Sequence, residues 1–173
     1  MPVILEKVAL QSIFNHARST YPEECCGFLL GSDSRLRKIN RALRAQNSSN
    51  ESPRNRYNIQ PEELIHADEE ARKLRLNLIG IYHSHPDAAA QPSSIDLEHA
   101  WPWYTYLVLS VQSGEPRYIT AWLLNEDGSR FNREHLKIVS SKSIKLRVLT
   151  TADLQNYDGY GGKMSDPFKV DRI

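Results

Sequence analysis

The stretch 77–96 constrains the fold more than any other part of the chain. Residues 77–82 form a short segment that is mostly apolar and partly β-branched, which predicts a strand that leads directly into His83-Ser84-His85. Side chains at positions i and i+2 share one face of a strand, so both imidazoles are expected to point the same way. The sequence therefore predicts a sheet in which one strand ends in two histidines that can bind one metal ion.

A third protein ligand is expected, because catalytic zinc commonly takes three donors from His, Asp, Glu or Cys and keeps one position for water. Asp96 is the best candidate, since it follows Ser93 at the expected entry to a short helix over residues 95–100. A strand that ends in two histidines and a helix that begins with an aspartate can converge on one point. The structural alternative is that Ser93 and Asp96 form a helix capping box and nothing more.

The full motif is His83-x-His85, seven residues that begin with a proline, Ser93, two residues and Asp96. Together with Glu-Cys-Cys-Gly-Phe-Leu-Leu-Gly at residues 24–31, it resembles the JAMM zinc metallopeptidases, the catalytically competent branch of the MPN domain. The likeness extends over about residues 1–140. It includes an expected strand at 56–59, an acidic helix after Pro61 and the stretch 101–111.

The resemblance implies the role of each site residue. His83, His85 and Asp96 would bind Zn²⁺, Glu24 would act as general base toward a zinc-activated water, and Ser93 would hold the oxyanion. Ser84 is expected to face away from the metal. From the residues alone, Glu24 also fits a surface carboxylate, and its neighbour Glu23 is the competing choice for the base.

The same resemblance implies a peptidase or isopeptidase that acts at the C-terminus of a ubiquitin-like protein, typically after Gly-Gly. The chain has little room for the inserted loops of eukaryotic relatives that cut polyubiquitin. It looks more like the compact prokaryotic members, which are associated with ubiquitin-like sulfur-carrier proteins. The alternative function is a non-catalytic MPN scaffold, although such relatives usually lack the ligands that this chain keeps.

The two cysteines, Cys25 and Cys26, are neighbours. In a strand they would point to opposite faces, so we expect no disulfide between them and a buried position for both. Spacing does not exclude a cysteine peptidase in which either thiol pairs with His16 or His99. The metal hypothesis treats those two histidines as ordinary surface or hydrogen-bonded residues, together with His66 and His135.

The composition indicates one soluble domain. A chain of 173 residues is long enough for one substantial core and short for two. The net charge of +1 gives no reason to expect nucleic-acid or membrane attraction. No apolar run approaches the roughly 20 residues that span a bilayer, and the first residues lack the pattern of a signal peptide. We therefore expect a cytoplasmic protein that binds neither nucleic acid nor membranes.

The periodicities along the chain predict an α/β or α+β fold, a sandwich of sheet and helix. The resemblance implies a mixed β-sheet flanked by helices, with a cytidine-deaminase-like architecture. Helices are expected at 10–17 and 60–76, and further strands at 24–30, 38–46, 104–112 and 118–124. Residues 1–140 would form the metallopeptidase domain. Residues 141–173, which include a segment rich in glycine and tyrosine, are predicted to be a partly loop-like extension.

One basic stretch bears on the partner. Between Arg35 and Arg56 there are seven Lys or Arg residues and one acidic residue, Glu51, and the stretch overlaps an expected mobile loop at 47–55. A solvated strand face is one explanation. As a hypothesis, the charge steers an acidic carrier protein toward the site, and reversal of charge at Arg41 and Arg44 would slow association in a salt-dependent way.

Overall fold

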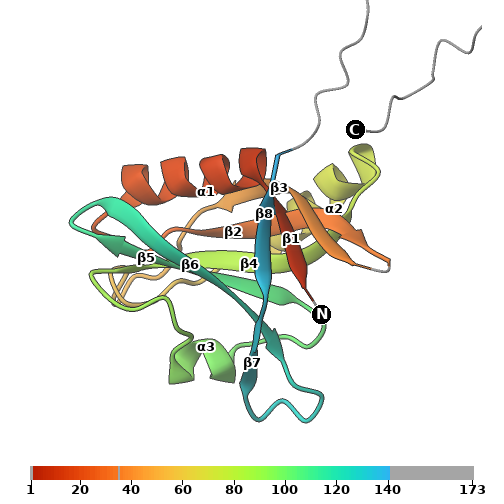
Figure 1. The fold of residues 1–173 in the computed structure, drawn as a ribbon. Helices are drawn as coiled ribbons and strands as arrows, with labels where there is room; N and C mark the ends of the chain where they lie inside the picture. The colour runs from red at the N-terminus through yellow and green to blue at the C-terminus, as the bar shows by residue number, and fades with distance from the viewer. Residues whose placement is uncertain (1, 35, 141–173) are drawn as a thin grey trace, which may run out of the picture. The chain divides into compact units, whose positions relative to one another are not determined.

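Residues 2–34 and 36–140 are described by the computed structural model, and they form an eight-stranded sheet with three helices (Figure 1). The sheet order is β7-β6-β5-β4-β2-β3-β1-β8. The strands are β1 (Val3–Glu6), β2 (Cys26–Asp33), β3 (Arg37–Ala45), β4 (Asn77–Pro86), β5 (Thr105–Gln112), β6 (Glu115–Leu124), β7 (Phe131–Glu134) and β8 (Leu136–Val139). The helices are α1 (Lys7–Thr20), α2 (Pro61–Lys73) and α3 (Ser94–Glu98). The predicted extension at 141–173 lies outside the described residues.

Strand β4 occupies the centre of the sheet, between β2 and β5. It runs antiparallel to β2, with Cys26 opposite His83, and parallel to β5, with Ser110 beside His85. Adjacent parallel strands require a crossover connection, and here residues 87–104 make it. This connection carries α3 (Figure 1). A contact between Asp96 of α3 and His83 places this helix beside the carboxyl end of β4.

The core is divided between the two faces of the sheet, because successive side chains of a strand point to opposite sides. Cys25 belongs to the cluster that packs against α1, whereas Cys26 belongs to the cluster that contains Ala67 of α2. The two cysteines are free and buried, so the prediction of opposite faces without a disulfide is confirmed. In β4, Tyr82 packs on the α1 side and Ile81 on the α2 side.

The prediction of a mixed sheet flanked by helices is confirmed, but some local predictions are wrong. Residues 56–59 form no strand; they belong to an irregular connection between β3 and α2. The Asn47 side chain fixes part of this connection by donating to the carbonyls of Glu24 and Arg56 and accepting from the Asn58 amide. The helix expected over 60–76 is shorter in the structure, because α2 ends at Lys73, and the next residue, Leu74, is 47% exposed.

Three short strands, β1, β7 and β8, were not predicted. Each has four residues, and β7 and β8 have no buried side chain that would produce a hydrophobic alternation. Within the described parts of the chain, none of the helices combines the length and the apolar character needed to cross a membrane.

Candidate functional site

Three side chains from the end of β4 and the start of α3 converge. The Nε2 atoms of His83 and His85 lie 3.0 Å apart. Asp96 places Oδ1 3.2 Å from Nε2 of His83 and Oδ2 3.6 Å from Nε2 of His85. One donor atom from each residue lies within 4.8 Å of the other two, so the three side chains are spaced closely enough to share one cation.

The two imidazoles are held in different ways. Nδ1 of His85 lies 2.8 Å from the carbonyl oxygen of Ala89. His83 is fully buried, its ring stacks on Tyr57 with centroids 4.7 Å apart, and its Nδ1 has no hydrogen-bond partner among the described residues. Burial lowers the pKa of His83, whereas for His85 the opposing effect of burial is outweighed by Asp96, Ala89 and Glu24, which raise its pKa. His83 is therefore expected to be neutral near pH 7, as a metal ligand must be.

Ser93 and Asp96 form a capping box at the start of α3, as the alternative to a metal-ligand role for Asp96 predicts. The Ser93 hydroxyl accepts from the Asp96 amide at 3.1 Å and donates to Asp96 Oδ2 at 2.7 Å, and the Ser93 amide donates to the same oxygen at 2.6 Å. Burial opposes ionisation, but the hydrogen bonds from His83, His85 and Ser93 hold the pKa of Asp96 well below its usual range. The cap thus fixes a charged carboxylate beside both imidazoles and does not remove it from the cluster.

Glu24 lies directly before β2, beside the histidines. The pairing of Cys26 with His83 is continued by a hydrogen bond from the Ser84 amide to the Cys25 carbonyl, so the next residue along, Glu24, comes opposite His85. Glu24 is only 4% exposed, and burial raises the pKa of its carboxyl from 4.5 to about 8, with a smaller lowering effect of His85 and a raising effect of Asp96. Glu23, the competing choice, is exposed.

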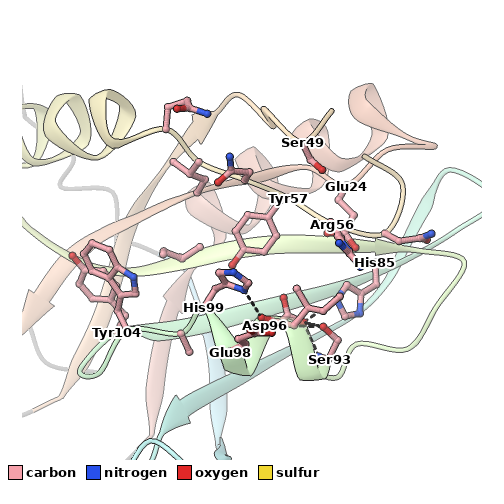
Figure 2. Close-up of a pocket in the computed structure, with 18 of the residues that line it drawn as sticks. Glu24, Ser49, Arg56, Tyr57, His85, Ser93, Asp96, Glu98, His99 and Tyr104 are labelled. Carbon is pink, nitrogen blue, oxygen red and sulfur yellow. Dashed lines mark hydrogen bonds and ion pairs between the residues drawn. The ribbon is translucent and has the colours of Figure 1, made fainter. Parts of the chain in front are cut away.

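A cavity of about 870 Å³ connects these groups. Figure 2 shows Glu24, His85, Ser93 and Asp96 toward one end of it and Tyr104 at the other. The remaining wall comes from residues 54–61, from α2 and from the segment 98–101. His83 lies behind the wall, and Ser84 points the other way, since its hydroxyl accepts from the Cys25 amide at 2.9 Å. Four of the five predicted site residues therefore line one cavity, and the fifth contacts two of them.

The donor set fits a metal ion of the zinc type. Two imidazole nitrogens and a carboxylate oxygen are the ligands that Zn²⁺ takes in catalytic sites. A carbonyl oxygen can only accept a hydrogen bond, so the contact with Ala89 requires a proton on Nδ1 of His85 and leaves the Nε2 lone pair free when the ring is neutral. Two nitrogen atoms at 3.0 Å need a proton or a cation between them, and the buried Asp96 carboxylate supplies the negative charge that favours a cation.

The cysteine-peptidase alternative is wrong. Both thiols are completely buried, and burial raises the pKa of Cys25 to about 11 and that of Cys26 further still. Of the two histidines considered as partners, His16 is engaged with the Tyr82 hydroxyl at 2.8 Å, and Nδ1 of His99 lies 3.0 Å from the carbonyl oxygen of Ile95. Neither thiol can provide a thiolate at neutral pH, which a cysteine nucleophile requires.

Two contributors to the site were not foreseen. Tyr57 was expected only as part of a strand, yet its ring covers His83. The carbonyl of Ala89 was not considered, because a backbone acceptor has no signature in the sequence.

The arginines of the basic stretch between residues 35 and 56 lie in two different places. Arg54 and Arg56 line the cavity, whereas Arg41 and Arg44 are exposed elsewhere on the described surface.

Comparison with known proteins agrees with this geometry. Residues 6–125 match the family described as prokaryotic homologs of the JAB domain. A desampylase from Haloferax volcanii is 39% identical over 107 residues, which cover 59% of this chain and 76% of the relative. A desampylase from Pyrococcus furiosus is 35% identical over 103 residues, which cover 60% of this chain and 68% of the relative.

Solved structures show the same fold. The solution structure of a protein from Desulfitobacterium hafniense gives a TM-score of 0.71 at 28% identity and covers 82% of this chain and 95% of that one. A second solution structure, of a protein from Salinibacter ruber, gives a TM-score of 0.63 at 38% identity and covers 78% and 90%. The expected resemblance to a compact prokaryotic JAMM/MPN protein is confirmed.

Proposed function

The chain belongs to the family of prokaryotic homologs of the JAB domain and is a hydrolase of that family, and we propose that it cuts a peptide or isopeptide bond at the C-terminus of a ubiquitin-like protein. A sulfur-carrier protein is the substrate we favour, and the proposed cofactor is Zn²⁺. One observation carries the proposal: His83, His85 and Asp96 converge beside a buried Glu24 at the wall of a single cavity.

His83, His85 and Asp96 would hold the zinc. Zinc bound there would supply Lewis acidity, which brings the pKa of a bound water toward about 7 and polarises a carbonyl. The residues contribute what this chemistry needs: two imidazoles, of which burial keeps His83 neutral, and a carboxylate that stays ionised because hydrogen bonds stabilise its charge.

Glu24 would accept the proton of the attacking water and later return a proton to the departing amine. Its environment suits both steps, because burial brings the pKa of its carboxyl to about 8, close to working pH, in the metal-free protein. Glu24 would lose its proton more readily beside a bound cation, since a nearby positive charge favours the carboxylate. Its position opposite His85 keeps this carboxyl next to the proposed zinc ligands.

Ser93 would donate a hydrogen bond to the oxyanion that forms when water attacks the carbonyl. In the structure its hydroxyl donates to Asp96 Oδ2 at 2.7 Å, so this role requires the hydroxyl proton to turn from Asp96 toward the substrate. Ser93 lines the cavity and is exposed at its surface, which is the position that such a donor needs.

The shape of the cavity and the relatives support the substrate class. The cavity of about 870 Å³ leads to Asp96 and Ser93 and can receive a polypeptide tail without an inserted loop. The relatives from Haloferax volcanii and Pyrococcus furiosus bear the name desampylase, which supports an isopeptidase activity. Free cysteines suit a reducing compartment, so a cytoplasmic reaction is part of the proposal.

Metal analysis combined with cleavage tests this function. The parent, Glu24→Gln and the exposed control Glu23→Gln would each be assayed for zinc and for cleavage of a ubiquitin-like carrier extended beyond its Gly-Gly end. We expect about one zinc per chain in all three proteins and cleavage by the parent and Glu23→Gln only.

Two results would contradict the proposal in different ways. Retained cleavage in Glu24→Gln would refute the assignment of the base. Full zinc occupancy without cleavage of any carrier or extended peptide by the parent would favour the non-catalytic scaffold.

A further inference from the structure

The turn between β4 and α3 is held by three consecutive backbone carbonyls. Ser110 donates its hydroxyl to the carbonyl of Ala88 at 2.6 Å, and Thr120 donates its hydroxyl to the carbonyl of Ala90 at 2.6 Å. The carbonyl between them, that of Ala89, is the one that lies 2.8 Å from Nδ1 of His85. Two hydroxyls thus fix the peptide groups on either side of the histidine's partner.

The sheet register explains why these hydroxyls reach the turn. Ser110 of β5 pairs with His85 of β4, so its side chain stands next to the histidine at the end of the strand. Thr120 of β6 pairs with Val108, one strand further out. The indole Nε1 of Trp122 donates to the Thr120 hydroxyl at 2.8 Å, which leaves the hydroxyl proton free to be donated to Ala90.

The described residues that line the cavity with Glu24 and Asp96 include neither Ser110 nor Thr120. Both instead line a separate hollow of about 330 Å³ behind the turn, and Ser110 is 1% exposed. Substrate in the main cavity would not touch them. Ser110 and Thr120 therefore do not act on the site by touching substrate, and their hydroxyls reach it through the turn.

The start of the turn is anchored as well. Asp87 has a φ of 52°, a left-handed conformation that is unusual for a residue other than glycine. Its carboxylate accepts from the Tyr21 hydroxyl at 2.8 Å and from the Ser113 amide at 2.8 Å, and its own amide donates to Val111 at 2.7 Å. The path of the turn is thus set before it reaches Ala88.

We propose that Ser110 and Thr120 are positioning residues of the metal centre, which hold the carbonyl of Ala89 where it fixes the tautomer and orientation of His85. A carbonyl cannot donate, so this contact places the proton on Nδ1 and directs the lone pair of Nε2 toward His83 and Asp96. The inference rests on the proposed metal site. No described group makes the corresponding contact to His83, because its Nδ1 has no hydrogen-bond partner among the described residues.

The test uses Ser110→Ala, Thr120→Val and the double variant. Thr120→Ser, which keeps the hydroxyl, is the conservative rescue. Thr105→Val is the matched control, because Thr105 is another buried hydroxyl of β5 that accepts a hydrogen bond, from Arg37, but does not touch the turn. Two readouts are taken: the ¹⁵N shifts of the His85 ring in metal-free protein above pH 8, and the affinity for Zn²⁺ by competition with a chelating dye.

We expect the parent, Thr120→Ser and Thr105→Val to keep the Nδ1-protonated tautomer. The double variant should populate the Nε2-protonated form and bind zinc about 10-fold more weakly, the scale found when a partner of a ligating histidine is lost. An unchanged tautomer and an unchanged zinc affinity in the double variant would overturn the inference. A tautomer that shifts as expected in a protein whose parent binds no zinc would support the positioning of His85 and refute the proposed metal function.

Discussion

The substitution Glu24→Gln should change how stability depends on pH in the metal-free protein. Burial raises the pKa of the Glu24 carboxyl from 4.5 to about 8, so the folded chain binds a proton that the unfolded chain releases between these values. Glu24 therefore contributes fully to stability below about pH 4.5, and this contribution is lost as the pH rises through about 8. Glutamine cannot ionise and removes this dependence.

The size of the effect follows from the shift. One pKa unit corresponds to about 1.4 kcal/mol, and Glu24 is only 4% exposed, so solvent screening removes little of it. Between pH 5 and pH 8 the free energy of unfolding of the parent should fall by about 3.5 kcal/mol more than that of Glu24→Gln. Such a loss is the stability cost of burying the ionised Glu24 carboxylate.

Urea unfolding of chelator-treated protein at pH 5 and pH 8 measures this difference, with fluorescence of the tryptophans as the signal. Glu23→Gln is the matched control, because it removes the same charge at the exposed neighbouring position. Its pH dependence should follow that of the parent. If Glu24→Gln also parallels the parent between pH 5 and pH 8, Glu24 has an ordinary pKa and the assignment of a buried base is refuted.

Further predictions concern single contributors to the site. His85→Ala should abolish stoichiometric zinc binding, measured by metal analysis; a variant that keeps one zinc removes His85 from the ligand set. Ser93→Ala should lower kcat about 100-fold or more with little change in KM, and Ser93→Thr should restore part of the lost kcat. A comparable rise in KM would instead indicate that Ser93 acts in substrate binding. Tyr57→Leu should weaken zinc binding about fivefold in a dye-competition titration, because the stacked ring that holds His83 is lost. Arg54→Glu with Arg56→Glu should slow association with an acidic carrier about tenfold at low salt and less at high salt, measured by stopped flow; a salt-independent rate contradicts steering.

The central strand and the approach of its histidines to α3 could be predicted from the sequence. The apolar run before His83 gives the strand, the i and i+2 spacing gives the shared face, and Ser93 marks the start of the helix. The same local signals predicted that Cys25 and Cys26 lie on opposite faces. These features depend on neighbours in the chain, so the pattern of residues carries them.

The features that could not be predicted from the sequence depend on tertiary contacts. Residues 56–59 have the composition of a strand, but Asn47 binds their backbone and they line the cavity as an irregular segment. The environment of Glu24 was equally hidden, because its burial results from the pairing of β2 with β4 and from the connection that packs over it. From the residues alone, Glu24 fitted a surface carboxylate; only the resemblance distinguished it from Glu23.

The most direct test of the account is metal reconstitution during cleavage of a ubiquitin-like protein joined through its C-terminal Gly-Gly to a lysine side chain. The protein would be stripped of metal, titrated with Zn²⁺ and assayed by mass spectrometry of the products. The account predicts no cleavage without metal, a rate that rises until about one zinc is bound per chain, and release of the carrier with an intact Gly-Gly end. Cleavage at the full rate by the stripped protein, or by Asp96→Ala after addition of zinc, would contradict it.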